Sequence, residues 1–264
     1  MLMKFIQRTP LTLLTAAVAV LAALAPLASQ AQAAGDAEGA GDSRWGAGLL
    51  VMPEVKPYRG VDDKTVVWPM VTFENRWVRV FGPGLEVKLG RSGALSYGLT
   101  VAYAREGYEA DDAAELAGME ERKASVWVGG RVNWQAGWAS LSADWSGDAM
   151  GHSKGQKLRL GAERRFAVGE FGLTPRLTAT WLDSKYVDYY YGVRAAEASV
   201  GRAAYTPGST VNTELGLRVD YRLAAQQTVF ADVGVTALGS AIKQSSLVDR
   251  STVPTVRLGY LYRF

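Results

Sequence analysis

The chain has 264 residues, one His and no Cys, and its formal net charge at pH 7 is +3. The lack of Cys excludes a disulfide framework and a thiolate metal site. No run of Lys and Arg interleaved with aromatic residues occurs, so the composition argues against nucleic acid as a partner.

Residues 1–33 have the three parts of a secretory signal peptide. Lys4 and Arg8 make the start positive, 10–27 is an apolar stretch rich in Ala and Leu, and Ala31-Gln32-Ala33 supplies a small-x-small cleavage site. An N-terminal membrane anchor is the alternative, which the high alanine content disfavours. Removal of Lys4 and Arg8 with the signal peptide lowers the formal charge from +3 to +1.

Residues 34–44 form a short segment of Gly, Ala and acidic residues that includes Asp36, Glu38 and Asp42. Such a composition cannot bury enough apolar surface to fold, so it predicts a flexible N-terminal arm on the periplasmic side of the membrane. Two roles stay open for this arm, a docking strip for a partner and a simple leader.

Apolar and polar residues alternate along most of 45–264. In 213–223, for example, Leu215, Leu217 and Val219 occupy odd positions, and charged residues or Gly occupy the even positions. A period of two is that of a β-strand, which places successive side chains on opposite faces. The pattern predicts about twelve strands, at 45–53, 65–74, 77–82, 85–90, 95–104, 124–134, 138–146, 156–166, 171–181, 213–223, 228–236 and 256–264. If Gly82-Pro83-Gly84 is not a turn, ten strands are expected instead.

The links between these strands alternate in length. Tight turns at 74–76, 91–93, 135–137, 168–170 and 224–226 alternate with longer links at 54–64, 105–121, 147–155, 183–210 and 237–253. Short periplasmic turns and long outer loops are typical of outer-membrane barrels. A soluble barrel has the same alternation, but aromatic residues gather near strand ends as in an interfacial girdle. The expected fold is an all-β, transmembrane, antiparallel up-and-down β-barrel in outer-membrane lipid.

The polar faces of the expected strands carry charges of both signs, among them Glu86, Arg131, Asp144, Glu214 and Arg218. Inside a barrel of this size, paired long side chains would largely fill the lumen. An interior closed by ion pairs is therefore one expectation, and a narrow channel for small solutes is the other.

The chain offers little for catalysis. His152 stands beside Ser153, with Asp148 nearby, and a Ser–His–Asp relay could be imagined from them. Adjacent side chains on a loop do not form a nucleophile–base pair, so a solvated loop His is expected and no enzyme activity. The acidic pairs Asp111-Asp112 and Glu120-Glu121 flank Leu116 in a polar loop and are expected at a hydrated surface. We therefore expect no metal or cofactor.

The most distinctive segment runs from Trp181 to Val193, where a strand is expected to emerge into the longest loop. It contains Asp183, Tyr186, Asp188, Tyr189, Tyr190, Tyr191 and Gly192. The tyrosines offer rigid amphipathic area, and the two aspartates are suited to capping turns. Two roles are open for this loop: a contact surface for a partner, or a lid that packs over the mouth of the barrel.

The last strand is amphipathic and aromatic. Tyr260, Tyr262 and the terminal Phe264 share one face, and Arg257, Gly259 and Arg263 lie on the other. A final strand of this kind resembles the signal that the barrel-assembly machinery recognises in outer-membrane proteins.

The segment from Trp181 to Val193, continued through Tyr205-Thr206-Pro207-Gly208, resembles the signature of the MipA/OmpV family of outer-membrane proteins. Further matches are Pro57-Tyr58-Arg59-Gly60, Trp68-Pro69 and Ser245 to Arg250, although Ser246 stands where the family suggests Pro. The resemblance covers residues 45–264.

The resemblance implies a non-enzymatic scaffold in the outer membrane of a Gram-negative bacterium. By family it would link a murein lytic transglycosylase and a penicillin-binding protein. A narrow channel, or a surface antigen or adhesin, is the alternative. A murein scaffold must be approached from the periplasm, yet the turns expected on that side are only a few residues long.

Overall fold

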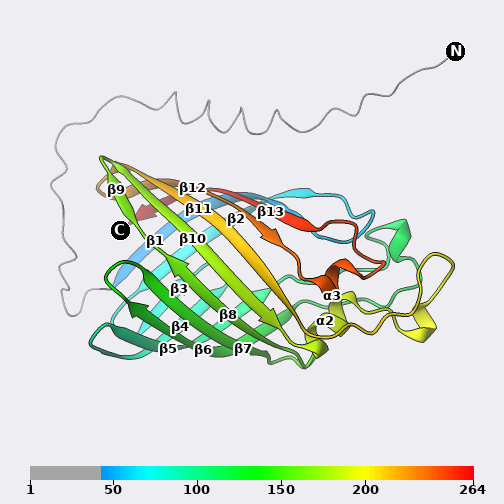
Figure 1. Ribbon diagram of the computed structural model, residues 1–264. Helices are drawn as coiled ribbons and strands as arrows, with labels where there is room; N and C mark the ends of the chain where they lie inside the picture. The colour runs from blue at the N-terminus through cyan, green and yellow to red at the C-terminus, as the bar shows by residue number, and fades with distance from the viewer. Residues whose placement is uncertain (1–42) are drawn as a thin grey trace, which may run out of the picture. The chain divides into compact units, whose positions relative to one another are not determined.

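A computed structural model describes residues 43–264, which form one continuous antiparallel sheet (Figure 1). Its strands, in chain order, are β1 (Arg44–Glu54), β2 (Lys64–Glu74), β3 (Val78–Phe81), β4 (Gly84–Ser92), β5 (Leu95–Ala104), β6 (Ser125–Gln135), β7 (Ser140–Asp148), β8 (Gln156–Glu163), β9 (Phe166–Val168), β10 (Phe171–Leu182), β11 (Thr210–Ala224), β12 (Gln227–Ala237) and β13 (Thr252–Arg263). The expected signal peptide and nearly all of the expected N-terminal arm lie outside the described residues.

The sheet closes on itself. β1 pairs with β13, from Gly46 opposite Arg263 to Val51 opposite Leu258, and the backbone N–H of Phe264 donates to the carbonyl of Trp45 at 2.9 Å. Closure removes the free edges that an open sheet would expose to lipid. The fold is therefore a closed antiparallel barrel, as the alternation predicted.

Twelve strand positions surround the barrel. β8 and β9 pair with successive parts of the same strand, β10, so they occupy one position interrupted at 164–165. Gly82 and Pro83 do form a turn, because Phe81 pairs with Gly84 and Gly82 has a φ of +54°, a conformation that suits Gly. The prediction of twelve strands is therefore confirmed over the alternative of ten.

The two ends of the barrel differ. One end carries the short turns 75–77, 93–94, 136–139, 169–170 and 225–226, together with the C-terminus. The other end carries the long loops and four short helices, η1 (Ala114–Leu116), α2 (Ser184–Tyr191), η2 (Ala195–Glu197) and α3 (Ser240–Lys243), as Figure 1 shows. Short turns face the periplasm in such barrels, so the helices cover the outer mouth.

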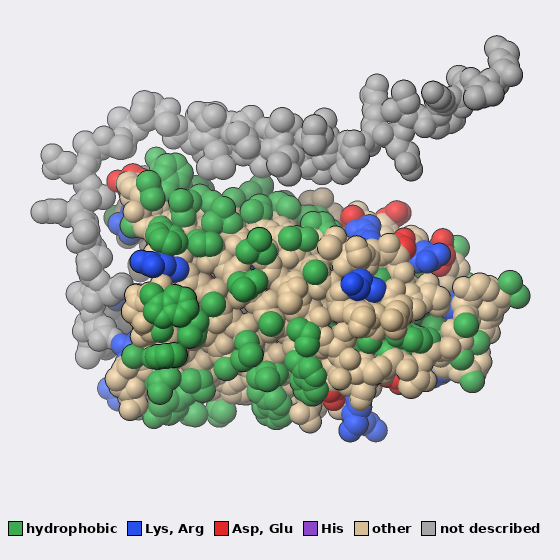
Figure 2. All heavy atoms as spheres, viewed as in Figure 1, with side chains coloured by type: hydrophobic (Ala, Val, Ile, Leu, Met, Phe, Trp, Pro, Cys, Tyr) green, Lys and Arg blue, Asp and Glu red, His purple; other side chains and the backbone are tan. Residues whose placement is uncertain are grey.

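The outer face of the strands is apolar. Leu49, Val67, Leu160, Leu177 and Leu215 are each more than half exposed, and Figure 2 shows hydrophobic side chains spread over the strands in view. Aromatic residues lie exposed near strand ends, as in an interfacial girdle: Trp45, Trp77, Trp134, Trp138, Trp145 and Trp181. No helix within residues 43–264 is long and apolar enough to span a membrane.

The inner face is charged over much of the wall. Arg176 lies 2.9 Å from Glu214 and 2.7 Å from Asp232, and Arg131 pairs with Asp144 and lies 3.6 Å from Glu86. These pairs lie along the inner wall, between strands that are adjacent or one strand apart, and let partly buried charges keep hydrogen-bonding partners. The two strands β1 and β2 depart from this pattern, because their inner face is also apolar.

Candidate functional site

The tyrosine-rich segment forms a helix rather than an extended loop. Asp183 caps helix α2 by accepting a hydrogen bond from the backbone N–H of Tyr186 at 2.9 Å. The side chains of Tyr186, Tyr190 and Tyr191 are buried, as is Val187. The helix thus turns three of its tyrosines into the protein.

Segments far apart in the chain meet around this helix. The hydroxyl of Tyr58 donates to the carbonyl of Tyr190 at 3.2 Å, and the hydroxyl of Ser245 donates to the carbonyl of Tyr191 at 2.6 Å. The backbone N–H of Arg59 donates to Leu247 at 2.8 Å. The three motif segments at 57–60, 181–193 and 245–250 therefore converge on one structure.

A single hydrophobic core unites them. Its buried members come from the loops at 55–63, 105–124, 183–209 and 238–251 and from adjoining strand ends: Tyr58, Val61, Tyr108, Leu116, Met119, Trp127, Leu182, Tyr186, Val187, Tyr190, Tyr191, Val193, Leu238, Ile242, Leu247 and Val248. We refer to these residues and the loops that carry them as the lid. Because the lid has a packed interior, the loops close the mouth of the barrel as a folded unit.

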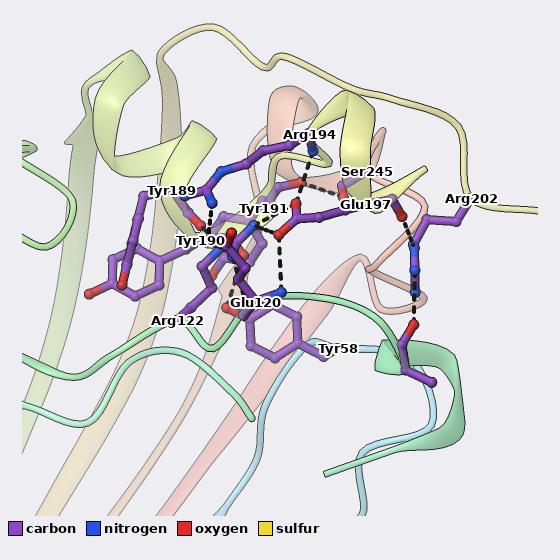
Figure 3. Close-up of polar contacts among 11 residues, drawn as sticks. Tyr58, Glu120, Arg122, Tyr189, Tyr190, Tyr191, Arg194, Glu197, Arg202 and Ser245 are labelled. Atoms are coloured by element: carbon purple, nitrogen blue, oxygen red, sulfur yellow. Dashed lines mark hydrogen bonds and ion pairs between the residues drawn. The ribbon is translucent and has the colours of Figure 1, made fainter. Parts of the chain in front are cut away.

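Arg122 and Glu197 form a buried ion pair inside the lid (Figure 3). One guanidinium nitrogen of Arg122 lies 2.8 Å from both carboxylate oxygens of Glu197, and the side chains are 1% and 4% exposed. Arg122 also donates to the carbonyls of Tyr189 at 2.6 Å and Glu120 at 2.8 Å. Its other two guanidinium nitrogens thereby each donate to a carbonyl, one of helix α2 and one of its own loop.

Further contacts hold the loops at the rim. The guanidinium of Arg202 donates to the carbonyls of Glu115 at 2.7 Å and Ala117 at 2.9 Å. Arg194 forms a more exposed ion pair with Glu120. The loop after η2 is thus tied to the loop that contains η1.

The lid shifts the ionisation of its polar groups. Burial alone would raise the pKa of Glu197, but hydrogen bonds from the backbone N–H of Arg194, the side chain of Arg122 and the N–H of Glu120 outweigh it and hold that pKa below its usual value. Burial raises the pKa of Tyr108 to about 12, and it raises the pKa of Tyr190 further. Glu197 is therefore charged and the tyrosines are neutral at pH 7.

The other motif residues have different surroundings. Tyr189 is half-buried, and its hydroxyl accepts from the N–H of Lys123 at 2.9 Å. The side chain of Asp188 is exposed, whereas its carbonyl accepts from the N–H of Gly192 at 2.9 Å. A Cβ at Gly192 would lie 2.4 Å from that carbonyl, so the close turn after α2 requires glycine.

The expected assembly signal lies on the barrel wall. Tyr260 and Phe264 are exposed, and the hydroxyl of Tyr262 donates to the side chain of Gln226 at 2.7 Å. The rings of Tyr262 and Phe264 are 5.2 Å apart, edge to face. These residues lie at the turn end of the barrel, and the lid is at the opposite end.

The alternation of the strands gave no indication of the lid core. The loop with Glu120-Glu121, expected as a hydrated surface, contains η1, and its Leu116 is fully buried. The expected hydrated surface holds for Asp111, Glu120 and Glu121, which are exposed, but Leu116 between the acidic pairs and the adjoining Arg122 are buried. Within this loop, the sequence signal was the apolar pair Leu116 and Met119 among polar residues.

The geometry around His152 does not form a relay. Nδ1 of His152 lies 2.9 Å from the carbonyl of Ala124, and Asp148 accepts from the hydroxyl of Ser153 at 2.8 Å. Asp148 also accepts from backbone N–H groups of its own loop, including that of Ser153 at 2.6 Å. The three side chains shape this loop, and no chain of hydrogen bonds runs from Ser153 through His152 to Asp148. Within residues 43–264, no group of three or more His, Cys, Asp or Glu could hold a metal ion.

A closed twelve-stranded barrel with an apolar belt, short turns at one end and a folded lid at the other defines an outer-membrane β-barrel protein. The particular family follows from comparison with known proteins. Residues 45–264 match the family described as MltA-interacting protein MipA, and the chain belongs to that family.

Three relatives support this membership. The chain is 24% identical to the putative outer membrane protein YiaT of Escherichia coli K12, over 79% of this chain and 86% of the relative. It is 25% identical to the MltA-interacting protein of the same strain, over 83% and 89%. It is 29% identical to the outer membrane protein OmpV of Vibrio cholerae, over 60% and 61%. The resemblance to the MipA/OmpV family and the outer-membrane location are thus confirmed.

Among solved structures, an outer membrane channel from Pseudomonas putida F1 covers 89% of this chain and is itself covered completely. The TM-score is 0.44 and the sequences are 10% identical. The barrel architecture therefore rests on the strand pairing of this chain itself.

Proposed function

We propose that this protein is a non-enzymatic scaffold of the outer membrane that binds murein-processing enzymes. A relative that aligns over most of both chains is named MltA-interacting protein, and by family resemblance the partner is a murein lytic transglycosylase. By family resemblance the second partner is a penicillin-binding protein. None of the relatives described above is named as an enzyme.

The closed lid is the observation that supports contact rather than transport. The mouth of the barrel is filled by a core in which Val187 and Ile242 are 0% exposed. Below it, arginine–carboxylate pairs between neighbouring strands line the inner wall and narrow the lumen. A barrel whose mouth is closed by a packed lid is suited to hold a partner at the membrane.

Enzymes that act on murein approach from the periplasm, so we place the contact surface at the turn end. The guanidinium of Arg76 lies 4.3 Å from the ring of Trp77, and that of Arg164 lies 5.1 Å from the ring of Phe166. Trp77 and Phe166 are exposed. Aromatic and Arg side chains are frequent at the centres of protein interfaces. The N-terminal arm at 34–44, expected on the periplasmic side, is a second candidate for a docking strip.

Site-specific photocrosslinking in intact cells tests this proposal. A photoreactive residue at Arg76 or Ala225, both exposed at the turn end, should capture a lytic transglycosylase or a penicillin-binding protein. The same residue at Lys185, exposed on the lid, is the matched control and should capture neither. Capture of both enzymes from Lys185 alone would contradict the proposal.

A second candidate is a narrow channel. A cavity of about 240 Å³ lies in the lumen, lined by polar residues that include Arg131, Asp144, Arg159 and Arg176. Conduction would require the lid to move away from the mouth. Steady conductance steps of the unmodified protein in planar bilayers would favour the channel over the scaffold.

We also infer that Tyr260, Tyr262 and Phe264 serve as the recognition signal for the barrel-assembly machinery. Their support is the exposed aromatic face of β13 at the turn end. Deletion of Phe264 should slow insertion in cells while leaving refolding in detergent unchanged. Equal insertion rates of the two proteins in cells would contradict this role.

A further inference from the structure

The barrel wall is interrupted between β2 and β5. β2 pairs with β3 only at Thr72–Glu74, since β3 turns back at Gly82-Pro83. Within residues 43–264, the lid-side part of β2, Lys64–Met70, therefore has a strand partner only in β1. On the other side, β5 has no β4 partner beyond Ala102. We refer to this opening as the window.

Two hydrogen bonds mark the edge of the window that lies away from the lid. The N–H of Gly82 donates to the carbonyl of Val71 at 3.1 Å, and the N–H of Tyr103 donates to the carbonyl of Pro83 at 3.2 Å. Pro69 lies on the unpaired edge of β2, where a residue without an N–H is tolerated. Unpaired strand edges are costly at membrane depth unless they line a cavity.

Such a cavity lies at the window. Its volume is about 390 Å³, within the roughly 300–1,000 Å³ typical of small-molecule sites. Pro69 and Tyr103 line it from the outer face of the wall, because their cross-strand partners Leu49 and Val126 face outward. Its inward-facing lining is mostly apolar, with Leu50, Met52, Trp68, Met70 and Phe81, and it also includes the charged Glu54 and Arg257. Side chains from both faces of the wall line one cavity, so it runs through the wall.

This cavity adjoins a polar one beneath the lid. The second cavity has a volume of about 720 Å³, and Glu54, Tyr103 and Arg105 line both. Arg105 stands at the junction, with its guanidinium 5.5 Å from the ring of Trp68 and 3.7 Å from the carboxylate of Glu54. The side chain of Arg105 is 51% exposed, so an anionic group can reach it.

We propose that the window binds one acyl chain of a membrane phospholipid. The chain would enter from the bilayer and lie along Trp68 and Met70. The phosphate would lie at Arg105 on the window side of the junction, because carboxylates outnumber cationic side chains in the lining of the polar cavity, whereas Arg105 and Arg257 both line the window cavity. The bilayer is the source because Val67 and Val71, exposed on β2 beside the window, belong to the apolar belt. Arg suits the phosphate because its planar group can donate two hydrogen bonds at once.

Tryptophan quenching tests the acyl chain. The folded protein is placed in phospholipid bilayers whose acyl chains are unlabelled or carry bromine, which quenches tryptophan on contact. The difference in emission between the unmodified protein and Trp68→Phe gives the fluorescence contributed by Trp68 alone. Trp145→Phe and Trp127→Phe are the controls, because Trp145 is 50% exposed on the outer face and Trp127 is 3% exposed in the lid core.

The expected result is that Trp68 loses emission in brominated bilayers to the same degree as Trp145, while Trp127 keeps its emission. If Trp68 behaves as Trp127 does, the proposal is wrong. Quenching of Trp68 only by free brominated fatty acid, added to unlabelled bilayers, would overturn entry from the bilayer.

Native mass spectrometry tests the head group without altering Trp68. The unmodified protein should retain a bound phospholipid after extraction, and Arg105→Gln should retain several-fold less. Arg250→Gln is the matched control, since Arg250 pairs with Asp63 at 3.0 Å and lines neither cavity. Equal retention by Arg105→Gln and Arg250→Gln would overturn the assignment of the phosphate to Arg105.

Discussion

Arg122 and Glu197, which are 75 positions apart in the chain, lie 2.8 Å from each other inside the lid and are almost fully shielded from solvent. The pair joins the loop between β5 and β6 to the loop between β10 and β11. Because Arg122 also donates to the carbonyl of Tyr189, it fixes the position of helix α2. This relationship makes the lid a cooperative unit and leads to the first two predictions.

Arg122→Ala should open the lid without unfolding the barrel. Removing one partner of a buried ion pair leaves an uncompensated charge, which costs about 3–5 kcal/mol. Limited proteolysis should then cut 105–124 and 183–209, while heat-modifiable migration on a gel stays intact. Arg194→Ala is the matched control, because its pair with Glu120 is exposed and worth no more than about 1 kcal/mol.

Acid should loosen the lid through Glu197. Its pKa in the folded protein is lower than its usual value of 4.5, so its contribution to stability is complete above pH 4.5 and is lost as the pH falls through the folded pKa. Near-ultraviolet circular dichroism of the lid tyrosines should be constant from pH 7 to pH 5 and change only in stronger acid. In Glu197→Gln this change of the circular dichroism in acid should disappear. If the change remains, its cause is the titration of another group.

Leu217→Arg tests which face of the strands meets lipid. Leu217 lies in the middle of β11 on the outer face, and an Arg near the bilayer midplane costs about 2–4 kcal/mol. The neighbouring Arg218→Gln should cost much less, because Arg218 faces the lumen and pairs with Asp220 at 2.9 Å. Insertion into lipid vesicles at graded urea concentrations measures both. Equal losses would show that the facing of β11 is wrong.

Replacing Tyr189, Tyr190 and Tyr191 with Ser should disrupt the lid. The buried rings of Tyr190 and Tyr191 belong to the lid core, and the hydroxyl of Tyr190 donates to the carbonyl of Lys123 at 3.1 Å. Protease sensitivity of the loops should rise while the barrel stays heat-modifiable. The corresponding Phe variant keeps the aromatic packing and should be much less sensitive. Failure of the Ser variant to insert would mean that the segment supports the barrel wall.

His152→Ala should leave any hydrolysis measured with the purified protein or in cell envelopes unchanged. Nδ1 of His152 contacts the carbonyl of Ala124. Asp148 accepts its hydrogen bonds from Ser153 and from backbone N–H groups of its own loop, and not from the imidazole of His152. Lipid, peptide and murein substrates should be assayed with Ser153→Ala as a parallel variant. A loss of hydrolysis shared by both variants would replace the scaffold with an enzyme.

The sequence alone determined the barrel. Strand geometry is local: a period of two fixes which side chains share a face, so Leu215, Leu217 and Val219 define the lipid side of their strand without knowledge of its neighbours. Turn chemistry is equally local and located the tight turns, but the sequence left twelve and ten strands open, and the pairing of Phe81 with Gly84 across Gly82-Pro83 decided for twelve. The family could also be inferred from short motifs, because each is contiguous in the chain.

Tertiary structure alone decided the lid and the window. Closure of the barrel brings every long loop to the same end, and only then do Tyr58 and Tyr190, 132 positions apart, come within hydrogen-bonding distance. The charged Arg122 is buried because Glu197 and helix α2 meet it from other loops, which no local pattern encodes. Likewise, Trp68 lines the window cavity because β3 is too short to pair with the part of β2 that carries Trp68. The length of β3 affects the surroundings of Trp68 only through strand pairing, which the sequence around Trp68 does not encode.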